Sequence, residues 1–316
     1  MNPAWSVIFF TTLAGAAQGL VVALAVAVLA GLAVGPGFLL GCLGLAVGML
    51  VLSLVASFFH LGHPERAWRA AMMWRTSWLS REVIVLPAFI GVVVLWAAVL
   101  GWGGRGGTLP PALATTWLPW AAIALAALLW LCTAMIYACI RFIQEWAHPL
   151  TLANYVLIGL ASGLVLLSAL AALAGETRLL AAAGPWAMVA TLVAGGVRTA
   201  SIVRNTGLKP KSTLQSATGI RSERLVQRAM GMSGGAFNTR EFFHGVAWQA
   251  LRRIKAAAIV FGFVLPLLAL VWAVAGGGTI AWVLALLLQA PGLVAERWFF
   301  FAQARHPQNL YYQVVS

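Results

Sequence analysis

Residues 37–59 read GFLLGCLGLAVGMLVLSLVASFF, a run that contains no charged side chain. A helix needs about 20 mostly apolar residues to cross the hydrocarbon core of a bilayer, so this run predicts a membrane-spanning helix. Seven comparable runs lie before and after it. The predicted spans cover residues 5–33, 37–59, 82–101, 115–140, 151–174, 179–200, 254–275 and 279–302. They predict an all-α integral membrane protein, an eight-transmembrane-helix bundle formed by a single domain over residues 1–316.

The composition also indicates a lipid environment. Hydrophobic residues make up 62% of the chain and charged residues 9%. A soluble domain carries about 25% charged residues. Gly and Ala are frequent inside the apolar runs, which suits close packing of helices in lipid. We therefore expect the outer surface of the bundle to face lipid tails.

The basic residues are distributed unevenly between the two ends of the predicted bundle. The chain has 20 Lys and Arg against 7 Asp and Glu. If every span crosses, only Arg105 and Arg178 fall on the side opposite the termini. The positive-inside rule then places both termini in the cytoplasm. A net charge of +13 can indicate nucleic acid binding, but we expect no nucleic acid partner because the positive charge follows the membrane topology.

The longest connection, residues 201–253, is the second distinctive feature of the sequence. A loop of this length in a compact bundle is usually functional or disordered, and its GGAFNTREFFHG stretch is rich in Gly and aromatic residues. We expect a long basic cytoplasmic loop that docks a soluble subunit with an acidic face; attachment to anionic lipid is the alternative. Arg221, Arg224 and Arg228 are spaced for one face of a short helix, and a second helix is expected to begin near Asn238. The residues expected to dock the partner are Arg66, Arg69, Lys209, Lys211, Arg221, Arg224, Arg228 and Arg240.

The connection between the second and third spans reads HLGHPERAWRAAMMWRTSWLSR over residues 60–81. Pro64 suits the first turn of a short helix. Ser80 is the expected N-cap of the third span, with Glu82 in its first turn.

Ionisable residues at membrane depth are costly and default to functional hypotheses. His60 ends the second span and Glu82 begins the third, so the two could face each other across one short connection. A quinone head group needs hydrogen-bond partners and proton donors at its two carbonyls. A histidine, which titrates near neutrality, and a buried carboxyl group suit that task; a capping role for each is the alternative. The predicted quinone-binding set is His60, Glu82, Arg81 and Arg141.

Two further charged pairs have less certain roles. Arg141 and Glu145 are four residues apart and could pair on one helix face. Glu296 and Arg297 lie inside the eighth span, where they could deliver protons or fix the packing. The opposite half of the bundle has almost no ionisable residues, which argues against a pump or transporter.

Metal and haem sites are not expected. Cys42, Cys132 and Cys139 lie inside apolar runs without metal-ligand spacing, so they are interpreted as packing residues and not as iron–sulfur ligands. A membrane b-type haem takes two axial histidines from facing helices. None of the five histidines falls in the leaflet opposite the termini, and we expect no haem.

Three segments carry a family resemblance: HLGHPERAW at residues 60–68, LSREV at 79–83 and ERWFFF at 296–301. They resemble the membrane-anchor subunit of dimethyl sulfoxide reductase-type molybdopterin oxidoreductases. The resemblance implies a location in the inner (cytoplasmic) membrane of a bacterium. It also implies two partners: an iron–sulfur subunit and a molybdopterin subunit that holds the active site. The His and Glu of the family's quinol site correspond to His60 and Glu82.

The basic side and the long loop depart from the reductase type, whose catalytic subunits face outward. In these features the chain is similar to the membrane subunits of cytoplasm-facing sulfite dehydrogenases, which oxidise sulfite to sulfate and reduce quinone. We therefore expect a quinone-binding anchor that passes electrons between an iron–sulfur subunit and ubiquinone or menaquinone. The alternatives are an anchor that oxidises menaquinol for a reductase, and a purely structural membrane tether.

Overall fold

The computed structural model describes residues 1–59, 61–104, 106 and 110–312. Eight of the helices in these residues are long and apolar enough to cross a membrane, which confirms the number of spans expected from the sequence. The spans are α1 (Trp5–Leu29), α2 (Pro36–Phe58), α3 (Trp78–Gly103), α4 (Leu118–Ala138), α5 (Pro149–Ala174), α6 (Thr177–Thr206), α9–α10 (Trp248–Ile259 and Leu265–Val274) and α11 (Gly278–Ala302). One π-helical turn joins α9 to α10 (η4, Val260–Val264), and another leads into α4 (η2, Leu113–Trp117).

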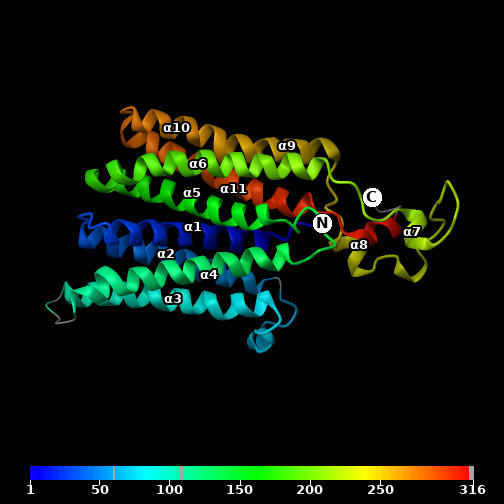
Figure 1. The fold of residues 1–316 in the computed structure, drawn as a ribbon, viewed down its shortest axis with the longest axis horizontal. Coiled ribbons are helices and arrows are strands. Elements are labelled where there is room, and N and C mark those ends of the chain that lie inside the picture. Colours follow the sequence, from blue (N-terminus) through cyan, green and yellow to red (C-terminus); the bar gives the residue numbers. More distant parts are fainter. Residues whose placement is uncertain (60, 105, 107–109, 313–316) are drawn as a thin grey trace.

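The long helices lie side by side, with α1 and α5 in the middle of the bundle (Figure 1). On one side of this pair lie α2, α3 and α4; on the other lie α6, α10 and α11. Glycines let α1 and α5 approach closely: a Cβ atom on Gly19 would overlap the backbone of Gly159, and one on Gly163 would overlap the backbone of Gly19. Contacts between small residues of this kind hold helices together in lipid. The α1–α5 seam therefore joins the two halves of the bundle.

Both termini and the short elements gather at one end of the bundle, which we call the basic end (Figure 1). The short elements are η1 (Pro64–Met73), α7 (Leu214–Thr218), η3 (Gly231–Ser233), α8 (Phe237–Glu241) and η5 (Pro307–Tyr311). The Asn2 amide donates to the Glu241 carbonyl oxygen over 2.8 Å, and the terminal ammonium of Met1 donates to the Ala304 carbonyl oxygen over 2.8 Å. The first bond ties the N-terminus to the long loop, and the second ties it to the segment that follows α11.

The long loop is less helical than the sequence suggested. Arg221, Arg224 and Arg228 do not share a helix, because residues 219–230 are irregular. Gly219 ends α7 in the left-handed conformation, at φ +72°, and short helices without a packed apolar face are marginal in water. The second short helix, α8, begins at Phe237, close to the expected Asn238; its N-cap is Ala236, whose side chain makes no capping hydrogen bond.

Two helix ends also differ from expectation. The N-cap of α3 is Ser77, whose hydroxyl accepts from the Ser80 amide over 3.3 Å. Ser80 is therefore inside the helix and Glu82 is in its second turn. At the same end of the bundle, the neighbouring helix α4 stops at Ala138. Arg141 and Glu145 lie in the turns that follow, so the predicted pairing on one helix face is wrong.

Candidate functional site

Glu82 is buried where α3 enters the bundle from the basic end. Glu82 is only 5% exposed. The hydroxyl group of Thr133 on α4 donates a hydrogen bond to the Glu82 carboxylate. Helices α3 and α4 run in opposite directions, so Thr133, near the end of α4, lies at the same depth as Glu82. None of the ion pairs found among the described residues includes Glu82.

Of the other residues in the predicted quinone-binding set, Arg81 and Arg141 are directed away from Glu82. His60 lies outside the described residues. The Arg81 side chain reaches back to the α2–α3 connection. Its Nε and Nη2 atoms donate hydrogen bonds to the carbonyl oxygens of Trp74 and Arg75, both over 2.9 Å. Arg141 is exposed beyond the end of α4. Arg81 thus holds the α2–α3 connection in place.

The surface beside the α2–α3 connection is apolar. Phe59 is 82% exposed, and Phe58, Leu61 and Leu79 are also exposed. Phe58 ends α2, Phe59 and Leu61 follow it, and Leu79 lies in the first turn of α3, the helix that carries Glu82. Exposed apolar groups at membrane depth suit contact with lipid or with an apolar molecule dissolved in it.

A second ionic cluster lies at a similar depth in the other half of the bundle. Glu296 on α11 contacts two guanidinium groups: its Oε1 is 2.7 Å from Nε of Arg198 on α6, and its Oε2 accepts from Nε of Arg297. All three residues are at most 3% exposed. The Arg297 guanidinium also lies 4.5 Å from the ring centre of Tyr155 on α5. The sequence indicated the Glu296–Arg297 pair but missed Arg198; the available signal was a basic residue inside the predicted sixth span.

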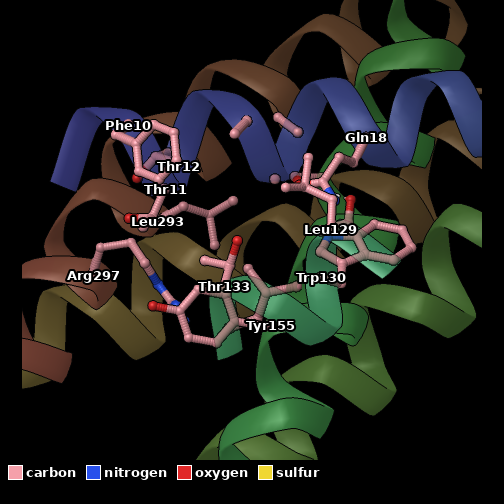
Figure 2. Close-up of a pocket in the computed structure, with 16 residues that line it drawn as sticks. Phe10, Thr11, Thr12, Gln18, Leu129, Trp130, Thr133, Tyr155, Leu293 and Arg297 are labelled. Carbon is pink, nitrogen blue, oxygen red and sulfur yellow. Dashed lines mark hydrogen bonds between the residues drawn. The ribbon is translucent and has the colours of Figure 1, made fainter. Parts of the chain in front are cut away.

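A small cavity lies between Thr133 and the second cluster (Figure 2). Its walls come from α1, α4, α5 and α11, and the space open to a water-sized sphere is about 20 Å³. Figure 2 shows Arg297 reaching toward Tyr155 on one side of this space, with Thr133 close by. The space can hold a water molecule but not a quinone ring. A quinone head group would therefore have to reach Glu82 from another direction, such as the apolar surface at the α2–α3 connection.

The residues expected to dock a partner subunit are all accessible. Arg66 and Arg69 are exposed on η1, and the six basic residues in or beside the long loop are exposed as well. Those six are Lys209, Lys211, Arg221, Arg224, Arg228 and Arg240. Acidic residues are few here, with Glu223 and Glu241 the examples within the loop. This face would attract a partner that carries negative charge.

Three histidines at the basic end accept hydrogen bonds from the backbone, and two of them, His148 and His306, are the N-caps of α5 and η5. The Nδ1 atoms of His148, His244 and His306 each accept from the backbone amide two residues later, over 3.1 to 3.2 Å. Burial lowers the pKa of all three. Arg204 lowers the pKa of His148 further, and the N-terminal ammonium does the same for the other two. Within the described residues, no three His, Cys, Asp or Glu side chains come together to hold a metal ion.

Eight membrane-length helices with buried ionic groups near one end define a multi-pass membrane protein with a polar interior layer. A profile of the DMSO reductase anchor subunit (DmsC) family matches residues 1–221, and the chain belongs to that family. It is thus a membrane anchor subunit of a DMSO reductase-type complex. A sulfite dehydrogenase subunit of Allochromatium vinosum is 46% identical over 328 residues, which covers 100% of both chains. The family resemblance identified from the sequence is confirmed.

Proposed function

We propose that this chain is the quinone-reactive anchor of a sulfite dehydrogenase complex, which passes electrons from a docked iron–sulfur subunit to the quinone pool. The observation that carries the proposal is the 46% identity to the Allochromatium sulfite dehydrogenase subunit over the full length of both chains. The molybdopterin active site, where sulfite becomes sulfate, lies in a further subunit. A buried carboxyl group beside an apolar, lipid-accessible surface supports the assignment.

We place the quinone head group at the basic end, between the α2–α3 connection and Glu82. Quinone reduction consumes two electrons and two protons. Glu82 would supply a proton at one carbonyl oxygen, and His60 would serve the other. Glu82 is suited to this role because, among the described residues, it has a hydrogen bond from Thr133 and no ion pair that a proton would break. General acid–base groups of this kind contribute about 10²–10⁴-fold to a rate.

The basic end would lie in the cytoplasm by the positive-inside rule. The iron–sulfur subunit would dock there on η1 and the long loop through the eight exposed basic residues named above. Electrons and protons would then both come from the cytoplasm, and quinone reduction would move no net charge across the membrane. A membrane-impermeant reagent should label cysteines introduced into residues 201–253 only after the cells are opened. Labelling in intact cells would reverse this orientation.

The quinone site is tested in the intact complex with two variants, His60→Ala and Glu82→Gln. Sulfite-dependent quinone reduction should fall at least about 100-fold, while sulfite oxidation with an artificial dye acceptor should persist. Glu223→Gln, the same substitution at an exposed loop position, is the matched control. Normal quinone kinetics in both site variants would move the quinone site elsewhere and leave this chain a structural tether.

The family name favours a second candidate, an anchor that oxidises menaquinol for a reductase. The purified complex distinguishes the two. We expect sulfite to reduce quinone, and we expect no quinol oxidation with dimethyl sulfoxide as acceptor. The opposite pair of results would establish the reductase.

A further inference from the structure

The cavity between α1, α4, α5 and α11 has polar walls whose hydrogen-bonding capacity is unused. Four lining residues place buried polar atoms there without a hydrogen-bond partner in the described part of the chain: Thr12 Oγ1, Trp130 Nε1, Tyr155 Oη and Arg297 Nη2. Trp130, Tyr155 and Arg297 are each more than nine-tenths buried. Leaving a buried polar group unpaired is costly, and folded proteins rarely leave several together.

The size of the cavity fits one small polar molecule. Its volume of about 20 Å³ exceeds the roughly 10–15 Å³ that a water molecule needs, and a buried water normally finds two to four polar partners. Arg297 Nη2 and Tyr155 Oη can donate to a water oxygen from one side (Figure 2). The Thr133 hydroxyl oxygen, whose hydrogen is already directed to Glu82, remains available to accept from the water.

We propose that this cavity binds a water molecule that relays protons to Glu82 through the hydroxyl group of Thr133. The inference rests on the proposed role of Glu82 in proton delivery. In each transfer, the water passes one hydrogen to Thr133 Oγ1 as Thr133 passes its own hydrogen to the Glu82 carboxylate. The water regains a proton from a hydronium ion of the aqueous phase at the basic end. The net change is that hydronium becomes water and the Glu82 carboxylate becomes a carboxylic acid.

The direction of the relay follows from the donors that surround the cavity. A guanidinium group can only donate hydrogen bonds, so Arg297 turns the water oxygen toward itself and the water hydrogens away. Thr133 Oγ1, which lines the same cavity, is an acceptor that such a hydrogen can reach in the proposed relay. Glu296 is unsuited to be the terminal acceptor, because protonating it would leave Arg198 and Arg297 without their shared anion. Tyr155 and Arg297 are thus positioning residues, and Thr133 is the relay.

The kinetic test compares Thr133→Val and Thr133→Ser in the intact complex. Valine keeps the volume of threonine and removes the hydroxyl, so sulfite-dependent quinone reduction should slow by about 10-fold or more. The solvent deuterium isotope effect should rise, because proton transfer becomes rate-limiting. Serine should restore both values, and dye-linked activity should be unchanged in all variants. Thr191→Val is the matched control: Thr191 is fully buried on α6 and donates to its own helix, at the Ala187 carbonyl oxygen.

The structural test is a density map of the complex that resolves ordered water. A peak within hydrogen-bonding distance of Thr133 Oγ1, Tyr155 Oη and Arg297 is expected, and a dry cavity would overturn the proposal.

Wild-type rates of quinone reduction in Thr133→Val would also overturn it. If Thr133→Val does not assemble, Tyr155→Phe, which removes only the hydroxyl, must slow the reaction or the relay is wrong. If Glu82→Gln loses quinone reduction while Thr133→Val keeps the wild-type rate, the relay is wrong but the proposed role of Glu82 stands. If Glu82→Gln keeps the wild-type rate, the proposed role of Glu82 is wrong as well.

Discussion

Glu82 and Glu296 are two buried carboxyl groups at a similar depth in the two halves of one bundle, yet their surroundings differ. Glu82 accepts a hydrogen bond from one hydroxyl group, that of Thr133. Glu296 is held between the guanidinium groups of Arg198 and Arg297. Burying an ion pair costs several kcal/mol per ion, which good geometry only partly recovers.

These different partners give the two carboxyl groups different roles: the charge of Glu296 stabilises the fold, whereas Glu82 can gain and lose a proton. At Glu296, gain of a proton would break two ion pairs and leave two buried cations. At Glu82, the same change disturbs one hydrogen bond. Burial alone therefore does not identify a reactive carboxyl group; its partners decide whether its charge can change.

The largest effect is expected for Glu296→Gln. The substitution keeps the shape of the side chain but leaves Arg198 and Arg297 without an anion. Removing one member of a buried pair costs about 3–5 kcal/mol, so thermal unfolding of the purified complex should begin at a clearly lower temperature. Glu223→Gln in the exposed loop is the control. An unchanged unfolding temperature in Glu296→Gln would show that the cluster does not bear on stability.

The seam between the two halves should be the next most sensitive. A Cβ atom on Gly163 of α5 would overlap the backbone of α1 at Gly19, so Gly163→Ala must push the helices apart. Overpacking of this kind costs about 1–3 kcal/mol. Gly91→Ala is the control, since the space around that position is open. Equal unfolding temperatures for the two alanine variants would contradict the close α1–α5 contact.

Glu82→Gln should barely affect stability. Its side-chain oxygen can still accept from Thr133, and no ion pair with any described residue is lost, so the expected change is less than about 1 kcal/mol. The measurement is the same thermal unfolding experiment, run beside Glu296→Gln. A loss as large as that of Glu296→Gln would show that Glu82 also has a cationic partner and would remove the contrast between the two groups.

The smallest effect concerns the start of α5, the helix that carries Tyr155. The His148 Nδ1 atom caps this helix by accepting from the Leu150 amide, and burial together with Arg204 lowers the His148 pKa below its ordinary value of 6.5. When this helix end opens, His148 returns to its ordinary pKa. As the pH falls below about 6.5, the opened form therefore binds a proton before the closed form does. The cap thus stabilises the helix end above that pH, and this stabilisation is lost below it. The loss should be well under 1 kcal/mol because the imidazole is partly exposed.

Hydrogen-exchange protection at Leu150 and Thr151 measures this loss between pH 7.5 and 5.5. His148→Asn supplies a capping acceptor that does not titrate, so its protection should change less with pH. Identical pH dependence in the two proteins would mean that the histidine cap has no influence on the helix end.

The sequence alone predicted the eight spans, because lipid demands about 20 apolar residues per crossing and this requirement is local. It also indicated the family, through HLGHPERAW and the segments beside Glu82 and Glu296. Helix ends were less predictable. The sequence predicted Ser80 as the cap of the third span, whereas Ser77 caps α3 in the structure.

The tertiary structure decided which polar groups meet. Thr133 is 51 residues from Glu82 in the chain, and Arg198 belongs to a different helix from Glu296. Hydropathy does not specify how helices are rotated or which faces they turn toward each other. Those choices come from close contacts such as the glycine seam between α1 and α5, since small residues set how near two helices can approach in lipid. The sequence thus determined that this chain crosses the membrane, and only helix packing determined which of its buried charges are paired.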